Sequence, residues 1–173
     1  KSRLERELNV KISNKGKLIF VEGNAENEFI AIEVLNAINY GFSMECSLKL
    51  KQEDALFQTL NIKDITKRPD LERVRGRIIG TQGKTLKTLQ NITNCDFSLH
   101  DNKIGIIGDA LDVEDGIQAI TSLVQGSKQG NVYERAERQK KKKRLEDRQN
   151  FREYTRRISL DLTRQGNIRI LHW

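Results

Sequence analysis

The sequence predicts an α+β protein in which three helices pack on one three-stranded antiparallel sheet. Two observations lead to this fold class. The chain of 173 residues repeats itself at a spacing of 85 residues, and its second copy carries helical and strand periodicities in a clear order. Residues 1–41 align without gaps with residues 86–126, and eight aligned pairs are identical. Roughly two or three identities are expected by chance, so two related modules explain the repeat.

The elements of the second copy begin before the repeat itself. Residues 55–64 are predicted to form a strand, and residues 71–79 a short helix that stops at Gly80. Residues 83–93 then carry leucine and isoleucine three residues apart, which is typical of a helix with one buried face. The glycine-containing segment from Gly80 therefore joins two predicted helices.

A hairpin and a third helix follow. Residues 95–99 and 103–107 alternate as two strands around turn residues 100–102. Asp112 is predicted to cap a helix that presents valine and isoleucine along one face and ends at Gly126. The order strand, helix, loop, helix, strand, strand, helix completes the predicted fold.

The repeat also predicts the domain organisation. We expect residues 1–42 to be part of a first module, residues 43–54 a linker helix, residues 55–127 a second module, and residues 128–173 a basic C-terminal helix with an extension. In the first copy, the equivalent of the glycine segment would precede Lys1, and the chain has no initiator Met. The first module is therefore expected to be truncated at its N-terminus.

Positive charge is concentrated in two places. The formal net charge is +7, and residues 127–173 hold 14 basic and 6 acidic side chains. Residues 67–87 carry seven basic and two acidic side chains. Focused positive charge favours phosphate-rich partners. For the tail, a solvated helix with intrahelical ion pairs is the alternative to an arm that binds RNA.

The composition disfavours several classes of protein. No apolar run is long enough to span a bilayer, and Cys46 and Cys95 lack the spacing of a zinc site or a disulfide framework. His100 and His172 provide neither metal-ligand spacing nor a catalytic triad. We expect a cytoplasmic binding protein without catalytic residues, metal or cofactor.

The segment RGRIIGTQGKT at residues 75–85 permits two functional interpretations. Its end resembles a nucleotide-binding P-loop, but that motif requires glycine where this chain has Ile78. A P-loop also follows a strand, whereas this segment follows a predicted helix. A β-branched residue does not adopt the backbone angles of a P-loop. A phosphotransfer enzyme is therefore disfavoured.

The second interpretation is a clamp on a nucleic-acid backbone. A Gly-x-x-Gly occurs by chance in such a chain, and residues 105–108 hold another one inside a predicted strand. The pair Gly80 and Gly83 differs, because it lies between helices and encloses polar residues. Glycines allow a sugar–phosphate backbone to approach, and the following helix N-terminus and Lys84 attract phosphate. This arrangement is the clamp of a K-homology (KH) module, which holds about four single-stranded nucleotides.

The candidate RNA-binding residues surround this loop. Arg73 and Arg77 share a helix face, with pairing to Asp70 or Glu72 as the alternative role. Neighbouring isoleucine and leucine side chains are assigned to the core, and one or two of them are expected to line the bottom of a base-binding groove. Gly105 is expected to let the edge of a base approach the backbone. The full candidate set is Arg73, Arg75, Arg77, Ile79, Gly80, Thr81, Gln82, Gly83, Lys84 and Lys87.

The motifs in their order resemble a known family. R-V-R-G-R-I-I-G-T-Q-G-K-T, N-K-I-G-I-I-G-D and Q-G-x-x-x-G-N-V-Y, with G-F-S at 41–43, are similar to the archaeal KH-domain ribosome-assembly factor related to the eukaryotic partner-of-Nob family. The resemblance covers roughly residues 1–145. It departs from the family pattern at Thr81-Gln82, where family loops often carry charge, and in the tail beyond about residue 145.

The resemblance implies two type I KH modules in tandem. It also implies binding to single-stranded RNA near the 3′ end of small-subunit rRNA, in ribosome assembly and 3′-end maturation. The implied partners are the rRNA maturation endonuclease and, in archaea, the alpha subunit of translation initiation factor two. A protein-interaction scaffold of degenerate KH modules is the alternative.

The end of the chain is predicted separately. Residues 131–154 contain neither Gly nor Pro and are compatible with a helix. Ile158–Leu162 and Asn167–Leu171 are expected to form a small hairpin that turns at Gln165-Gly166. Trp173 either covers an apolar patch or contacts a partner.

Overall fold

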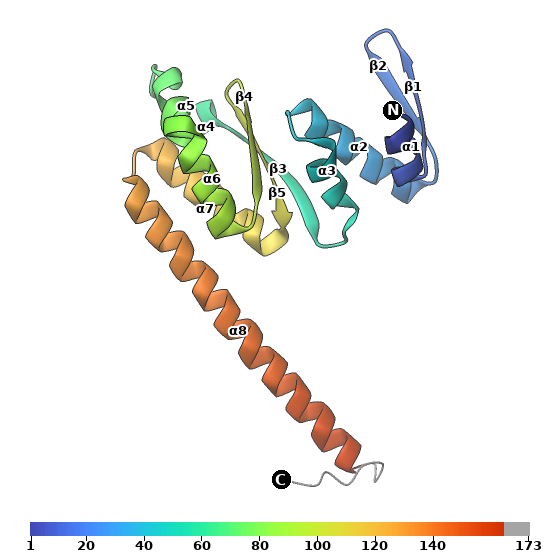
Figure 1. Ribbon diagram of the computed structural model, residues 1–173, viewed down its shortest axis with the longest axis vertical. Coiled ribbons are helices and arrows are strands. Elements are labelled where there is room, and N and C mark those ends of the chain that lie inside the picture. Colours follow the sequence, from blue (N-terminus) through green and yellow to red (C-terminus); the bar gives the residue numbers. More distant parts are fainter. Residues whose placement is uncertain (165–173) are drawn as a thin grey trace. The chain divides into compact units, whose positions relative to one another are not determined.

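The computed structural model describes residues 1–164, with side chains through residue 159. Residues 1–136 form one compact unit, and the described residues from Glu137 onward form a second. The elements in chain order are α1 (Ser2–Leu8), β1 (Lys11–Lys15), β2 (Leu18–Glu22), α2 (Ala25–Asn39), α3 (Met44–Ser47), a 3-10 turn (Leu48–Lys51), β3 (Ala55–Asn61), α4 (Ile62–Ile65), α5 (Leu71–Ile79), a second 3-10 turn (Thr81–Gly83), α6 (Lys84–Thr93), β4 (Asp96–His100), β5 (Lys103–Asp109), α7 (Ala110–Gln125) and α8 (Gln129–Arg164) (Figure 1).

The centre of the fold is a three-stranded antiparallel sheet in the order β3-β5-β4. Helices α5, α6 and α7 cover one face of this sheet (Figure 1). Their shared core includes Ile78, Leu89, Ile104, Ile106 and Ile120, which are completely buried. The predicted α+β arrangement of three helices on one antiparallel sheet is therefore confirmed for this part of the chain.

The opposite face of the sheet is also covered. Ile107 of β5 belongs to a second core that it shares with Phe42 and with residues of α1 and α2. A Cβ atom added to Gly105 would lie 2.6 Å from Cε2 of Phe42. The prediction that Gly105 admits a base edge is wrong, because its bare backbone makes room for the Phe42 ring instead.

Polar contacts fix the segment after α2 against the edge strand β4. The Ser98 hydroxyl donates a hydrogen bond of 2.7 Å to the carbonyl of Tyr40. Nζ of Lys49 lies 2.5 Å from Oδ2 of Asp96. Residues 43–54 contain the short helix α3, whose N-cap Ser43 accepts a hydrogen bond from the N–H of Cys46, and the 3-10 turn that follows it.

The N-terminal part of the chain is an antiparallel hairpin with two helices. β1 pairs with β2 so that Ile12 faces Val21. Asn24 is the N-cap of α2, and its side chain accepts a hydrogen bond of 2.7 Å from the N–H of Asn27. Leu4, Leu8, Ala31 and Val34 are buried in its core. The order α1-β1-β2-α2 is the same as the order α6-β4-β5-α7.

Two predicted boundaries are corrected by local capping. The strand predicted for residues 55–64 ends at Asn61, because the Asn61 side chain accepts a hydrogen bond of 3.1 Å from the N–H of Lys63 and starts α4. Helix α7, the third helix on the sheet, begins at Ala110 rather than after Asp112. Asp109 is its N-cap, so β5 passes into α7 without an intervening loop.

α8 is longer than predicted. The helical pattern at 131–154 is confirmed, but the helix continues to Arg164. The predicted strand Ile158–Leu162 is therefore wrong, since these residues continue the helix. Asn167–Leu171, His172 and Trp173 lie outside the described residues. Within the described part of the chain, no helix has the length and apolar character needed to cross a membrane.

Candidate nucleic-acid interface

The glycine loop, residues 80–83, lies on the surface between α5 and α6. Gly80, Gln82 and Gly83 all have positive φ, at 73°, 53° and 74°. Thr81 and Gln82 are exposed at the tip of the loop. The backbone therefore turns sharply between two helices with Thr81 and Gln82 at the surface, which is the placement predicted from the sequence.

The two glycines are required for different reasons. At Gly80 a Cβ atom would lie 2.9 Å from the backbone nitrogen of Thr85 and closer still to its hydroxyl. At Gly83 a Cβ atom would have nothing within 4 Å, so only the positive φ favours glycine. Gly80 thus packs the loop against α6, whereas Gly83 leaves an open surface at the start of that helix.

The N-terminus of α6 faces this open surface. No side chain among the described residues caps it, and its first turn contains no acidic residue. The first N–H groups of a helix lack partners within the helix, and the helix dipole adds partial positive charge there. Lys84 is exposed in the same turn. The end of the loop is therefore suited to an anion.

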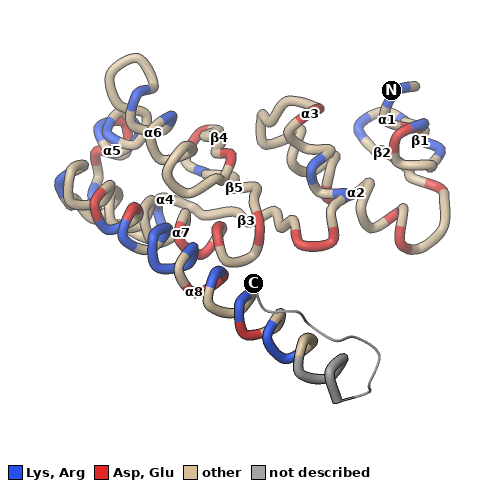
Figure 2. Tube along the Cα trace, turned by 60° about the horizontal axis from the view of Figure 1, so that its bottom comes forward, with Lys and Arg blue, Asp and Glu red and all other residues tan. Residues whose placement is uncertain are grey.

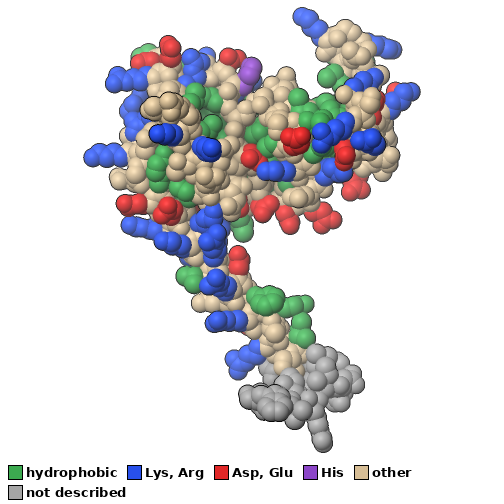
Figure 3. Space-filling view, viewed as in Figure 1, with side chains coloured by type: hydrophobic (Ala, Val, Ile, Leu, Met, Phe, Trp, Pro, Cys, Tyr) green, Lys and Arg blue, Asp and Glu red, His purple; other side chains and the backbone are tan. Residues whose placement is uncertain are grey.

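Basic side chains gather around the loop. Lys and Arg colour much of α5 and the start of α6 in the trace, and the same side chains gather over this surface in the space-filling view (Figures 2 and 3). Arg73, Lys84 and Lys87 are exposed, and Arg75 is half-buried. Ile79, next to the loop, is 39% exposed and adds an apolar surface.

Arg77 differs from the other basic candidates because the chain itself binds its guanidinium. Nη2 of Arg77 donates a hydrogen bond of 2.9 Å to the carbonyl of Gly126, and a second one to the carbonyl of Ser127. These carbonyls follow the last turn of α7, where the helix dipole favours a cation. The geometry therefore favours a supporting role for Arg77 over direct contact with phosphate.

Gln129 is a loop-supporting residue that the sequence did not reveal. Its Nε2 lies 2.8 Å from Oγ1 of Thr85 and 3.3 Å from the carbonyl of Arg77. Gln129 is the first residue of α8, and Thr85 is buried in the first turn of α6. A glutamine after a helix end carries no sequence signal for such a contact, because its partner is 44 residues away.

The described cysteine thiols and His100 lie in three different surroundings. Burial, followed by a hydrogen bond to Asp96, raises the pKa of the Cys46 thiol to about 12. Cys95 is buried in the core, as predicted, and Nδ1 of His100 lies 3.6 Å from Asp101. The part of the chain that the structure describes contains no cluster of His, Cys, Asp and Glu able to hold a metal.

Comparison with known proteins gives this site a context. Residues 56–141 match the model of the second KH domain of PNO1, described as a eukaryotic-type KH domain of type I. The KH domain-containing protein MJ0443 of Methanocaldococcus jannaschii is 26% identical over 149 residues, which are 82% of this chain and 66% of that protein. The pre-rRNA-processing protein PNO1 of Eremothecium gossypii is 36% identical over 104 residues. That match covers 58% of this chain and 39% of that protein, so the chain spans less than half of the fungal relative.

A solved structure shares the fold over most of the chain. It is the crystal structure of an a/eIF2alpha–aDim2p–rRNA complex from Pyrococcus horikoshii, with a TM-score of 0.75 and 29% identity. The similarity covers 82% of this chain and 82% of the matched chain. The glycine loop at residues 80–83 lies inside the segment that matches the KH family model.

Proposed function

Because residues 56–141 belong to the family of type I KH domains found in PNO1, we propose that this protein binds single-stranded rRNA during assembly of the small ribosomal subunit. One observation carries the proposal. The glycine loop is exposed between two helices, is surrounded by basic side chains, and leads into a helix whose N-terminus no described side chain caps. That geometry suits the backbone of an unpaired strand.

The proposed contacts follow from exposure and charge. The main chain of residues 80–83 lies against the sugar–phosphate backbone, with Thr81 and Gln82 at its tip. Arg73, Arg75, Lys84 and Lys87 supply positive charge, and Ile79 supplies an apolar surface for a base. Arg77, bound to the end of α7, holds the loop from behind.

The names of the relatives support a more specific role. The fungal relative is a pre-rRNA-processing protein, and the archaeal complex contains rRNA together with the alpha subunit of initiation factor two. We therefore propose the 3′ end of small-subunit rRNA as the site of action, in 3′-end maturation, and the initiation factor subunit as a partner. The maturation endonuclease is proposed as a further partner from the family resemblance alone.

Residues 1–42 are proposed to be part of a first KH module in tandem with the second. The shared order of elements and the offset of 85 residues support this. The proposed second module spans residues 55–127, with a linker at 43–54 and a basic helix and extension at 128–173.

A scaffold function is the second candidate, and the exposed apolar side chains of the first module favour it. Leu18, Ile19, Phe20, Phe29 and Ile32 of β2 and α2 are each at least 43% exposed. Contiguous exposed apolar surface commonly marks an interaction site. Such a surface permits protein docking at the first module while the second module binds RNA.

Salt dependence separates the two functions. We expect a labelled oligonucleotide from the 3′ end of small-subunit rRNA to bind with an affinity that falls steeply as ionic strength rises. For single strands the slope of log K against log salt is about −0.7 per phosphate contacted. Fluorescence anisotropy over a series of salt concentrations measures it. The absence of oligonucleotide binding at low salt would exclude the RNA-binding function and favour the scaffold.

A further inference from the structure

Four arginines form a stripe along the part of α8 that follows residue 136. They recur every four residues and all are exposed: Arg144, Arg148, Arg152 and Arg156. Because an α-helix turns by about 100° per residue, the four side chains keep to about a third of the helix surface over a length of about 18 Å. Figure 2 shows Lys and Arg in blue following one another along this helix. We call these four residues the arginine stripe.

Two ion pairs within α8 involve acidic side chains of the same segment. Oε1 of Glu146 lies 3.7 Å from Nζ of Lys142, and Oε1 of Glu153 lies 2.7 Å from Nη2 of Arg157. Both pairs use a cation outside the arginine stripe. Among the side chains that the structure describes, no ion pair or hydrogen bond includes a guanidinium of the stripe. The ion pairs expected of a solvated helix are therefore present, but they do not neutralise the stripe.

The spacing within the arginine stripe is unfavourable for the helix by itself. Residues four positions apart on a helix are neighbours, and like charges at that spacing destabilise the helix. Three such pairs follow one another from Arg144 to Arg156. The two central members, Arg148 and Arg152, have no Asp or Glu three or four positions away in the sequence. A bound polyanion would offset this repulsion.

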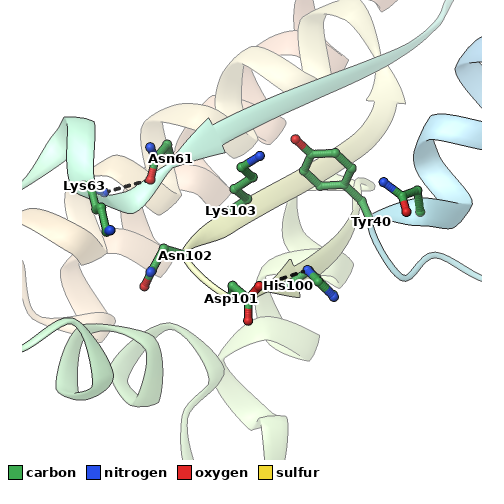
Figure 4. Close-up of a pocket in the computed structure, with 8 residues that line it drawn as sticks. Tyr40, Asn61, Lys63, His100, Asp101, Asn102 and Lys103 are labelled. Carbon is green, nitrogen blue, oxygen red and sulfur yellow. Dashed lines mark hydrogen bonds and ion pairs between the residues drawn. The ribbon is translucent and has the colours of Figure 1, made fainter. Parts of the chain in front are cut away.

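Two lysines of the first compact unit differ from the arginine stripe, because neighbouring groups offset their charge. Nζ of Lys49 lies 2.5 Å from Oδ2 of Asp96. Nζ of Lys103 lies 5.9 Å from the centroid of the Tyr40 ring, whose face attracts a cation (Figure 4). The described side chains around the stripe provide no such partner, so its charge is free to attract a ligand.

Exposed aromatic rings lie beside the arginines. Phe151 and Tyr154 are 71% and 64% exposed, and apolar side chains gather on this part of α8 in the space-filling view (Figure 3). Phe151 follows Arg148 by three positions, so it borders the arginine stripe. An unpaired nucleic-acid strand stacks its bases on aromatic rings while basic side chains bind its backbone. The combination therefore favours an RNA strand over an acidic protein segment.

We propose that the arginine stripe binds the phosphate backbone of RNA and is a second RNA-binding site in addition to the glycine loop. The inference rests on the proposed RNA-binding function, which already brings a polyanion to this protein. The planar guanidinium group matches the oxygen atoms of a phosphate with two parallel hydrogen bonds. Contacts of this kind carry no sequence information, so the stripe is expected to add affinity and salt dependence rather than specificity.

Two RNAs and one variant test the proposal. The variant R144Q/R148Q/R152Q/R156Q removes the charge of the stripe, and Gln has nearly the same helix propensity as Arg. A tetranucleotide fills the glycine-loop clamp alone, and its binding is expected to stay unchanged. For an extended oligonucleotide of the same rRNA 3′-end sequence we expect at least roughly tenfold weaker binding. Its salt slope is expected to be smaller by up to about 2.8, which is 0.7 for each of four phosphates.

The matched control removes four positive charges from the same helix but outside the stripe. This variant is K140Q/K142Q/K143Q/R157Q, and it is expected to bind the extended oligonucleotide clearly more tightly than the stripe variant does. Circular dichroism checks that both variants keep the helix. Equal weakening by the two variants would overturn the proposal, because only the total charge of the helix would then matter.

The remaining outcomes separate this inference from the proposed function. A stripe variant that binds the extended oligonucleotide like the wild type overturns the inference, while wild-type binding of the tetranucleotide still supports the glycine loop. Wild-type protein that binds neither RNA overturns the proposed function. Poly-glutamate probes an acidic protein partner. If it binds the wild type more tightly than the stripe variant, and RNA binds both equally, the stripe is a protein-binding site and the RNA proposal is wrong.

Discussion

Nε2 of Gln129 donates a hydrogen bond of 2.8 Å to Oγ1 of Thr85 and so ties the first turn of α8 to the first turn of α6. Thr85 is also the residue against which Gly80 packs. The back of the glycine loop is therefore fixed by a residue from the segment that follows the third helix of the module. The conformation of the loop depends on α8 being attached there.

The first prediction concerns Gln129. Gln129→Ala removes both of its hydrogen bonds and is expected to lower the free energy of unfolding by about 1 to 2 kcal/mol. The loop amides of residues 80–83 are expected to exchange faster with solvent, and RNA affinity to fall severalfold. Hydrogen exchange followed by NMR measures the first effect. The control is Gln125→Ala at an exposed position of α7, and equal exchange rates in the two variants would contradict the supporting role.

The second prediction separates the two loop glycines. Gly83→Ala adds a side chain in open space and costs only the strain of a positive φ, about 1 to 2 kcal/mol. Gly80→Ala is strained more strongly, because φ 73° with ψ 176° is a conformation that essentially only glycine adopts, and its methyl group also collides with Thr85, so its loss of stability is expected to be clearly larger. Urea denaturation of both variants measures the difference. Equal losses would show that the close approach of Gly80 to α6 is not a constraint.

The third prediction tests the contact between the sheet and Phe42. Gly105→Ala is expected to destabilise the protein by about 2 kcal/mol, because the new methyl group overlaps the Phe42 ring. Adding Phe42→Ala frees that space, so the double variant should lose less than the sum of the single losses. Gly76→Ala, whose new methyl would have nothing within 4 Å, is the control. Additive losses would contradict the packing.

The fourth prediction follows from the pKa of Cys46. Burial and Asp96 raise that pKa to about 12, so the thiol is almost fully protonated near neutral pH. Because folding favours the protonated thiol, its stabilising effect is complete below about pH 8.5, the unfolded pKa, and is lost as the pH rises towards 12. Alkylation requires the thiolate and is expected to be at least roughly 100-fold slower in the folded than in the urea-unfolded protein.

Iodoacetamide labelling near pH 8, with mass spectrometry of each cysteine peptide, measures this rate for Cys46 separately from Cys95. Labelling of Cys46 at the same rate in the folded and unfolded protein would contradict its raised pKa.

The sequence predicted the α+β fold of residues 55–127 because its local signals agree with each other. The glycine pair between two helical patterns and the alternating strands each describe short segments that fold as their own residues dictate. Two boundaries failed at single residues where one element passes directly into the next. Asn61 ends a strand by accepting a hydrogen bond, and Asp109 caps α7 three residues before the predicted cap.

Contacts between distant segments were not predictable from these patterns. Gly105 was predicted to border a base-binding groove, but it makes room for the ring of Phe42, 63 positions earlier in the chain. Only the packing of residues 1–54 on the sheet reveals this contact. Arg77 was predicted to contact phosphate, whereas its guanidinium donates hydrogen bonds to two carbonyls that follow α7. The predicted strand at Ile158–Leu162 failed because its alternating apolar residues continue a long helix.

Reversing the charge at the tip of the glycine loop tests the RNA-binding role most directly. The variant T81D/Q82D places two carboxylates where phosphate is proposed to lie, and Asp tolerates the positive φ of Gln82. Its matched control, T81N/Q82N, has nearly the same shape without the charge. Anisotropy titrations with the rRNA 3′-end oligonucleotide are expected to show at least about tenfold weaker binding for the Asp variant than for the Asn variant, with both folded. Equal affinities for the two variants would contradict the loop as the site of RNA binding.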